Sequence, residues 1–401
     1  MSTLRGTMQV TSKTIVYVTA ALSASAVLTA YAADDKLSAP YATKSVRNQP
    51  KVIPRPDGAT LAVPKGFKIE EFAADFQRPR MMLLGPSMEI LLTDSIPKEG
   101  KVYVLTNYGK DRKELVANLD RPFGLAFYKE WLYIAETTSV KRYPYDAKTM
   151  TAGPGQEIIS FKEFGQGHWT RCLQFDEKAG KFYLGIGSAS NVSPGENPMR
   201  AAIMRFNADG SDMEMIAQGT RNPTSIHFFP GTTTLWAAVQ ERDELGDDLV
   251  PDYFIQVKKD GFYGWPYSYI GPNEDPRNKG QRDDLVKRTL EPDLILGAHV
   301  AVLDFAFYTG KQFPTEYQNG AFMAFHGSWN RADRVGQTVV FVPFKNGKPT
   351  GEIKEFLSGW TLGKDKREVW GRPVGLMQLP DGSILVTDDG GNKVWRISYK
   401  G

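Results

Sequence analysis

Apolar and polar positions alternate over short segments, and these segments recur along the chain. Phe123-Gly-Leu-Ala-Phe127 is followed by Trp131-Leu-Tyr-Ile-Ala135, and Val374–Leu379 is followed, after Pro380-Asp-Gly-Ser383, by Ile384–Thr387. Alternation with a period of two, bounded by Gly, Pro and Asp, predicts β-strands joined by tight turns. Units of roughly 40–50 residues built from such strands are typical of β-propellers.

Six units of this kind follow one another. They begin at Arg78, Arg121, His168, Arg221, near Ala301 and at Arg372. The last unit runs out of chain after about three strands, and the alternating segment Phe67–Phe72 is expected to supply its fourth strand. We therefore predict an all-β fold, a six-bladed β-propeller whose last blade is closed by an N-terminal strand. The proline-rich insert from Gly264 to Ala298 is expected to be a loop between units four and five.

The N-terminus has the features of an export signal. Arg5 and Lys13 precede an uncharged apolar run from Thr14 to Ala32, and Ala30-Tyr-Ala32 places small residues where a signal peptidase cleaves. We predict a signal peptide over 1–32, an extended arm over 33–60 and a catalytic propeller over 61–401, in a periplasmic or secreted protein. The alternative is an uncleaved membrane anchor. No other segment of the sequence is suited to span a membrane.

Composition removes several classes of function. A net charge of +3 gives no general field for nucleic acid. Cys172 is the only cysteine, so an intrachain disulfide and a multi-cysteine zinc site are excluded, and its place in an apolar segment predicts burial. The sequence lacks a Gly-x-Gly-x-x-Gly fingerprint, a Walker loop and a Gly-x-Ser-x-Gly elbow, so nicotinamide, nucleotide and serine-hydrolase chemistry have no support.

A polar residue recurs where the innermost strand of each unit begins. These residues are Arg78, Arg121, His168, Arg221 and Arg372. Equivalent positions of successive blades face the same axis, so the residues should form a mostly cationic ring at one mouth of the channel. Such a ring suits an anionic ligand, and a histidine in it suits proton transfer. The alternative for His168 is a turn histidine that hydrogen-bonds to the backbone.

Three further motifs carry polar groups that suit a ligand. Arg221-Asn222 offers donors for carboxylate or quinone oxygens, unless it caps a turn and Arg221 pairs with a nearby acid. The loop Gln240–Asp248 offers oxygen ligands for Ca²⁺, unless it is a solvated acidic loop. His326-Gly-Ser-Trp-Asn-Arg331 could stack against a flat ligand and hydrogen-bond to it.

In this order the segments resemble the soluble pyrroloquinoline quinone (PQQ)-dependent sugar dehydrogenases, within them the L-sorbosone and aldose sugar dehydrogenase branch. The resemblance runs from about Val63 to Ile397. The matching segments are Pro64–Ile69, Arg121–Leu125, the turn at His168, Gly219–Pro223, Glu241–Glu244 with Tyr263–Pro266, His326–Arg331, and Gly371–Gly375 with Pro380–Gly382.

The resemblance implies PQQ over the channel mouth with a bridging Ca²⁺, and His168 as the general base. The implied cofactor contacts are Arg221, Asn222, Arg372, Ser328, Trp329, Asn330 and Arg331. The implied calcium ligands are backbone carbonyls of the loop at Gln240, Glu241 and Arg242. The chain departs from sugar-oxidising relatives at Gly167, where they often have Asp, and at Ser188, where they often have Asp after Gly.

The expected function is oxidation of an aldehyde or of the anomeric hydroxyl of a sugar-like substrate, by hydride transfer to PQQ. Because the sequence has no Cys-x-x-Cys-His haem motif, electrons would leave to a separate acceptor. Two alternatives stay open: a metal-dependent hydrolase of the lactonase type, and a non-catalytic binding propeller. A hydrolase would need carboxylates and Asn around calcium, where the predicted ring has Arg and His.

Overall fold

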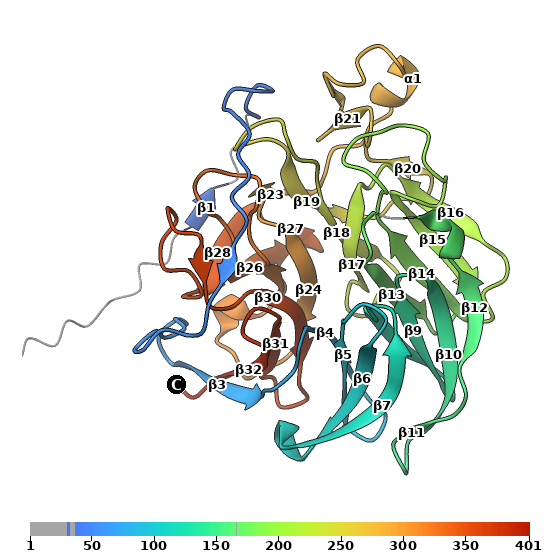
Figure 1. Cartoon of the computed structure of the whole chain (residues 1–401), viewed down its shortest axis with the longest axis vertical. Helices are drawn as coiled ribbons and strands as arrows, with labels where there is room; N and C mark the ends of the chain where they lie inside the picture. Colours follow the sequence, from blue (N-terminus) through green and yellow to red (C-terminus); the bar gives the residue numbers. More distant parts are fainter. Residues whose placement is uncertain (1–29, 33–36, 166) are drawn as a thin grey trace, which may run out of the picture.

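Six β-sheets surround a central axis in the computed structural model, which describes residues 30–32, 37–165 and 167–401 (Figure 1). The innermost strands are β4 (Pro79–Leu84), β8 (Gly124–Tyr128), β13 (Arg171–Asp176), β17 (Asn222–Phe228), β24 (Val302–Tyr308) and β30 (Pro373–Gln378). Each contacts the next in chain order, and β30 contacts β4, so the ring is closed. The prediction of a six-bladed propeller is confirmed.

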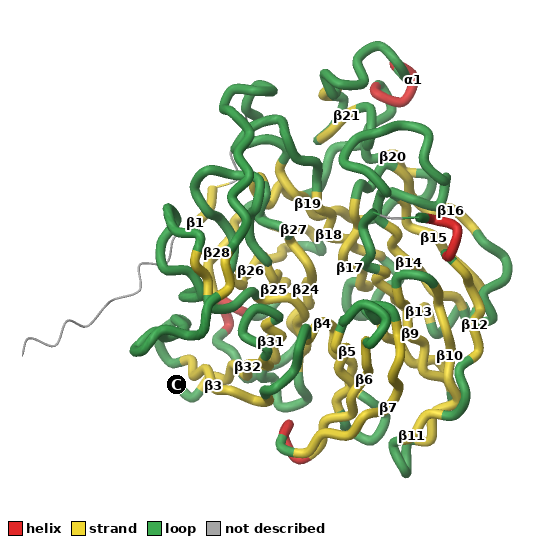
Figure 2. The backbone as a smooth tube through the Cα atoms, viewed as in Figure 1, coloured by secondary structure: helices red, strands yellow, loops and turns green. Residues whose placement is uncertain are grey.

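The remaining strands build the blades outward from the axis (Figure 2). Blades one to three continue with β5 (Ile90–Asp94), β6 (Gly100–Thr106) and β7 (Asp111–Leu119); with β9 (Trp131–Glu136), β10 (Ser139–Asp146), β11 (Thr151–Ala152) and β12 (Gln156–Ser160); and with β14 (Lys181–Ile186), β15 (Ala202–Asn207), β16 (Glu214–Gln218) and β20 (Gly261–Phe262). Blades four to six continue with β18 (Leu235–Gln240), β19 (Pro251–Gln256) and β23 (Leu294–Ala298); with β25 (Gly320–Phe325), β26 (Thr338–Lys345), β27 (Lys348–Pro349), β28 (Glu352–Leu357) and β1 (Ala30–Ala32); and with β31 (Ile384–Asp388), β32 (Lys393–Tyr399) and β3 (Phe67–Ala73). Short elements outside the blades are β2 (Lys51–Val52), β29 (Glu368–Val369), β21 (Ser268–Tyr269), β22 (Asn273–Glu274), α1 (Asp283–Val286) and the 3-10 turns Asn107–Gly109, Lys162–Phe164 and Thr315–Tyr317.

The apolar core lies in the seams between neighbouring blades. Because successive side chains of a strand face opposite sides of its sheet, one strand supplies two seams. In β5, Leu91 packs between blades one and two, whereas Leu92 packs between blades six and one. In β18, Ala237 packs toward blade three and Ala238 toward blade five. A blade is therefore stable only with a neighbour on each side.

The strand from the N-terminal side closes the ring, as predicted. β3 pairs antiparallel with β32, from Phe67 opposite Tyr399 to Ala73 opposite Val394, and Figure 1 shows the blue strand beside the red one. The ring of Phe67 lies 4.8–5.3 Å, centroid to centroid and close to edge-on, from the rings of Phe313, Tyr317, Phe356 and Tyr399. Aromatic pairs in this geometry add to the stabilisation from burial.

The insert differs in position from the prediction. It lies inside blade four rather than between units four and five, because β23 forms the fourth strand of that blade. Leu294 and Leu296 of β23 alternate with less buried residues and pack into the seam with blade five. The rest of the insert, with β21, β22 and α1, projects at the top of Figure 1.

Residues 37–60 form an extended arm that runs along two loops at one end of the propeller. Tyr41 N donates to Leu245 O and Asn48 N donates to Trp329 O, both at 2.7 Å. Farther on, β2 pairs in parallel with β29. The predicted signal peptide lies mostly outside the described residues, and only its last three residues are described, as β1 beside β28. No helix in the described ranges has the length and hydropathy needed to cross a membrane.

We predict that Phe67→Ala lowers the free energy of unfolding by about 2–4 kcal/mol, because it removes a partly buried ring of the closing strand β3 from the seam between blades five and six. Chemical denaturation followed by tryptophan fluorescence would measure the change. Lys68→Ala, at the neighbouring exposed position of β3, should change it by less than about 0.5 kcal/mol. Equal effects of the two substitutions would contradict a closing role for this ring.

Candidate active site

A cavity of about 190 Å³ lies at the end of the channel where the innermost strands begin. It is lined by His168, Arg221, Gln240, Glu241, Asp243, Asp252, His299, Ala301 and Trp329. His168 precedes β13, Arg221 precedes β17 and Ala301 precedes β24, so blades three, four and five meet here. The structure thus brings together two members of the predicted ring, His168 and Arg221.

His168 is held as a neutral base. Its Nδ1 lies 2.9 Å from Ser188 O and 3.1 Å from Ser188 Oγ. A carbonyl only accepts, so Nδ1 carries the hydrogen and Nε2 keeps its lone pair. Burial, together with the nearby Arg221 guanidinium, lowers the pKa of His168 to about 3. The imidazole is therefore a proton acceptor at neutral pH. The bond from Nδ1 to the Ser188 carbonyl is the one expected of a turn histidine. Nε2 takes no part in that bond and keeps its lone pair for proton transfer.

Two glycines allow this close packing. A Cβ on Gly187 would overlap Asn222 Oδ1 and would lie 2.6 Å from His168 Cβ. Gly167 has a φ of 138°, and a Cβ there would overlap Ala189 Cα. The position where relatives often have Asp therefore has no room for a side chain in this chain.

Arg221 is buried, and its guanidinium is held by the surrounding loops. Nε and Nη2 donate to Asn191 O and Oδ1 at 3.1 and 3.0 Å, and Nη1 donates to Glu241 O at 2.5 Å. Nη2 also lies 3.3 Å from Asp243 Oδ2. Arg221 does pair with an acid, as the alternative interpretation proposed, yet it still lines the cavity. Asn222 lies beneath, where its Nδ2 donates to Gln240 Oε1 at 3.0 Å.

Asp252 and His299 lie outside every motif predicted from the sequence, and Asp243 belongs only to the predicted acidic loop. His299 Nδ1 lies 3.4 Å from Asp243 Oδ1, and Nε2 lies 2.9 Å from Gly246 O. Burial lowers the pKa of His299, but these two acceptors outweigh it and raise the pKa overall. Burial raises the pKa of Asp252, which accepts from the backbone N–H of Glu241 and Val302. The only sequence signal was the acidic loop itself.

The side chain of Arg242 joins the loop to the insert. It is fully buried, with Nε 2.8 Å from Glu241 Oε2 and Nη1 3.0 Å from Asp275 Oδ2. Its Nη2 donates to Ser268 O at 2.6 Å. Glu241 Oε1 is buried and has no partner among the described residues. Within the same residues, no three His, Cys, Asp or Glu side chains are grouped to hold a metal. Calcium binding by backbone carbonyls of Glu241 and Arg242 stays a prediction.

Of the turn 328–331, the structure places only Trp329 at the cavity. Ser328 Oγ accepts from Val335 N at 3.1 Å. Asn330 donates to Val46 O at 3.1 Å and accepts from Glu244 N at 2.8 Å. Arg331 donates to Asp247 O at 2.7 Å. These three residues hold the turn, the arm and the acidic loop together, and a direct cofactor contact for them stays a prediction.

Blades six and one place other cations at the same end. Arg372 Nε and Nη2 donate to the carbonyls of His326 and Gly327 at 3.1 and 3.2 Å. Arg78 is exposed, whereas Arg80 in β4 is buried, with Nη2 2.6 Å from Asp389 Oδ2. Arg78 has the same register as Arg372, because Pro79 lies opposite Asp94 as Pro373 lies opposite Asp388. Its side chain is exposed, however, so the buried cation of blade one is Arg80.

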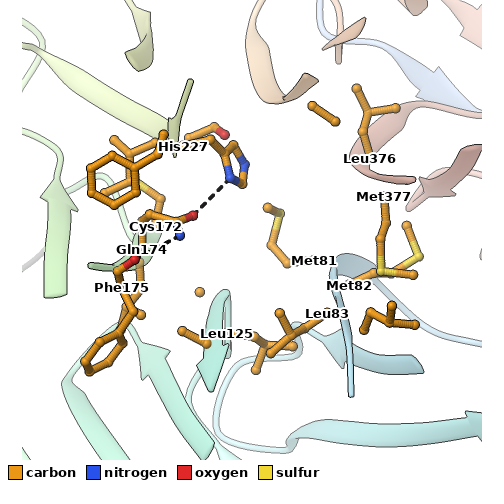
Figure 3. Close-up of a pocket in the computed structure, with 18 of the residues that line it drawn as sticks. Met81, Met82, Leu83, Leu125, Cys172, Gln174, Phe175, His227, Leu376 and Met377 are labelled. Atoms are coloured by element: carbon orange, nitrogen blue, oxygen red, sulfur yellow. Dashed lines mark hydrogen bonds between the residues drawn. The ribbon is translucent and has the colours of Figure 1, made fainter. Parts of the chain in front are cut away.

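A second cavity of about 470 Å³ lies in the channel, lined by the innermost strands of all six blades (Figure 3). Methionines and leucines face it, and His227 lies 3.2 Å from Gln174 Oε1 and 3.3 Å from Asp304 Oδ1. Cys172 is buried as expected, and burial raises the pKa of its thiol to about 12. The polar groups here bond to one another, so the mouth is the better candidate site.

We predict that His168 of the cofactor-free protein stays neutral from about pH 8 to about pH 5, because its pKa is near 3. A histidine in the unfolded chain titrates near pH 6.5. The contribution of neutral His168 to the free energy of unfolding is therefore complete above that pH and is lost as the pH falls toward 3. Imidazole NMR shifts, assigned by single substitution, would follow each histidine. A midpoint near 6.5 for His168 would contradict the buried environment described here.

Comparison with known proteins places this architecture in a family. The TrAA12-like family model matches residues 61–253 and 272–400. An uncharacterized protein of Borreliella burgdorferi is 30% identical over 367 residues, which are 85% of this chain and 92% of that protein. The PQQ-dependent pyranose dehydrogenase of Coprinopsis cinerea is 25% identical over 317 residues, 64% of this chain but 43% of that enzyme.

Solved structures agree on the fold. The holo PQQ domain of the Coprinopsis cinerea pyranose dehydrogenase has a TM-score of 0.73 at 20% identity, covering 86% of this chain and 98% of that one. The soluble aldose sugar dehydrogenase of Escherichia coli has a TM-score of 0.63 at 16% identity, covering 83% of this chain and 99% of that one. The family match and the similarity to the Coprinopsis cinerea enzyme, with which this fold agrees, confirm the predicted resemblance to soluble PQQ sugar dehydrogenases. The narrower sorbosone branch stays a prediction. Because the family model covers most of the sequence, the chain belongs to the TrAA12-like family.

Proposed function

We propose that the protein is a PQQ-dependent dehydrogenase that oxidises an aldehyde or the anomeric hydroxyl of a sugar-like substrate. The observation that carries this proposal is His168, a neutral imidazole whose Nε2 keeps its lone pair at the cavity between blades three, four and five. A sugar hydroxyl that loses hydride must also lose its proton, and such a histidine can take it.

The chemistry of the donors at the mouth fits PQQ, a flat tricarboxylate. Trp329 offers an aromatic face, and Arg221 lines the same cavity. The side chain of Arg372 donates hydrogen bonds to backbone carbonyls. Burial lowers the pKa of Arg372 to about 10, so the guanidinium stays cationic at neutral pH. Arg221 and Arg372 would hold carboxylates, and Trp329 would stack against the ring system. A nearby Ca²⁺ would be held by backbone carbonyls of the loop at Gln240, Glu241 and Arg242, because the carboxylates of Glu241 and Asp243 already pair with Arg242 and Arg221.

When bound, PQQ would supply the hydride acceptor and Ca²⁺ would supply Lewis acidity. His168 Nε2 accepts the hydroxyl proton, while the bond from Nδ1 to Ser188 O fixes the orientation of the ring. Asp243 favours the imidazolium that forms, whereas burial and Arg221 disfavour it. The proton is therefore held weakly and returns readily to solvent.

The proposal includes the setting of the enzyme. The predicted signal peptide supports a periplasmic or secreted location. In the same proposal, the enzyme acts on a small sugar or aldehyde, passes electrons to a separate acceptor and binds no nucleic acid. A lactonase-type hydrolase and a binding propeller are the competing functions, and the following experiment separates them.

Purified protein incubated with PQQ and Ca²⁺ should shift the absorption spectrum of the quinone and should reduce an artificial electron acceptor when aldoses or aldehydes are added. The measurement is a spectral titration followed by steady-state kinetics. Lactone hydrolysis without quinone would favour the hydrolase instead. The absence of a spectral shift and of turnover on every sugar and aldehyde would contradict the proposal.

We predict that His168→Ala lowers kcat/KM by about 10²–10⁴-fold, the range typical of a lost general base. The dissociation constant for PQQ should change by less than about threefold, because His168 is proposed to act on the substrate. His227→Gln, in the channel cavity, is the control that should retain turnover. Loss of PQQ binding in His168→Ala would assign this residue to cofactor binding or structure.

A further inference from the structure

A second group of side chains lies beside His168 and has no part in the proposed mechanism. We call Arg80, Arg121 and Trp169 the Trp169 cluster. The guanidinium carbons of Arg80 and Arg121 lie 5.2 and 5.9 Å from the centroid of the Trp169 ring, and Phe123 meets that ring edge-on at 5.7 Å. Trp169 directly follows His168, so the cluster and the base meet at the start of blade three.

Arg80 has one donor in use and one unpartnered. Its Nη2 pairs with Asp389 Oδ2 at 2.6 Å, and Asp389 Oδ1 also lies 2.8 Å from His326 Nε2. The side chain of Arg80 is only 9% exposed, yet its Nε has no partner among the described residues. A buried donor of this kind is costly unless a ligand or water satisfies it.

Arg121 has no hydrogen bond or ion pair from its guanidinium within the described ranges, and the guanidinium lies over the face of Trp169. It is half-buried, and its φ of 53° places it in the left-handed region that favours Gly or Asn. An arginine is thus kept where a smaller residue would be less strained, and no carboxylate of the described chain neutralises it. The position points to an external anion.

We infer that the Trp169 cluster binds an anionic group of the substrate, the carboxylate of a uronic acid or the phosphate of a sugar phosphate. A guanidinium is suited to bidentate contact with either group, and the indole face is suited to the C–H face of a sugar ring. The inference rests on the proposed function in one respect: the reacting carbon of that sugar is placed at His168.

The order of the blades separates this subsite from the cofactor contacts. Arg80, Arg121 and Trp169 come from blades one, two and three, whereas Arg221, Trp329 and Arg372 come from blades four, five and six. His168 stands between the two sets. A substrate anion on one side and PQQ on the other would bring the anomeric carbon next to the base.

The test uses the full chain without cofactor, titrated by calorimetry with glucuronate, glucose 6-phosphate and glucose. The wild type should bind at least one anionic sugar tighter than glucose by about tenfold or more. Arg121→Gln should weaken the binding of that sugar by about tenfold and should leave the affinity for glucose unchanged. The tighter of the two anionic sugars identifies the group, carboxylate or phosphate. Arg121→Lys should lie between wild type and Arg121→Gln, because it keeps the charge but loses the planar fork.

Arg142→Gln is the matched control. Arg142 also lies in blade two, is half-buried, and has its guanidinium 4.6 Å from the centroid of Trp131, away from the mouth. The Arg142→Gln variant should bind all three sugars with the same affinities as the wild type. Melting temperatures of the variants would exclude unfolding as the cause of weaker binding.

A PQQ titration separates the inference from the proposed function. Arg372→Gln should weaken PQQ binding, whereas Arg121→Gln should not. If Arg121→Gln weakens PQQ binding and leaves the affinity for the anionic sugars unchanged, Arg121 is a cofactor contact and the inference is wrong. Equal binding of glucose and both anionic sugars by the wild type also overturns it. If no PQQ binds, the proposed function fails, while the sugar titration still reports on the subsite.

Discussion

The structure depends on the closure of the ring. Each blade is apolar on both faces, so a blade without a neighbour would expose one face of its core. Five of the seams join units that follow one another in sequence, whereas the sixth brings blade six against blade one, with β30 beside β4. Blade six is itself complete only when β3 pairs with β32. The candidate site inherits this dependence, because its residues belong to separate blades and meet only when all seams are formed.

At the mouth, the arrangement of charges decides what each group can do. His168 stays neutral because burial and Arg221 oppose its protonation, and Ser188 O fixes its tautomer. Arg221 in turn is held by Asn191 and Asp243, and Asp243 also contacts His299. The base is therefore positioned by a chain of contacts through loops of blades three and four, and a change in any of them would alter its basicity before it altered the fold.

Local patterns explain which parts were predictable. Alternation and turn residues fixed the strands, the six units and the closing strand, because those signals lie within a few residues. The partners of Arg221, the pairing of Asp243 with His299 and the network of Arg242 with Asp275 join residues 20 to 56 positions apart, and spacing alone does not show such contacts. The sequence also did not show that Arg80, paired with Asp389 of blade six, is the buried cation of blade one. It did not show that β23 extends blade four, because the alternation of β23 lies within a proline-rich insert.

In blades one, two and six, the start of the inner strand is anchored within its own blade. Asp94 accepts from the backbone N–H groups of Gln77 and Arg78, Glu136 from that of Asp120, and Asp388 from that of Arg372. In these three blades the start of the inner strand is thus fixed by a carboxylate of the neighbouring strand rather than by the next ring residue. Substitutions at different ring positions should therefore be nearly additive in their effect on folding while remaining coupled through any ligand that spans them. Such a scaffold can change its specificity one blade at a time.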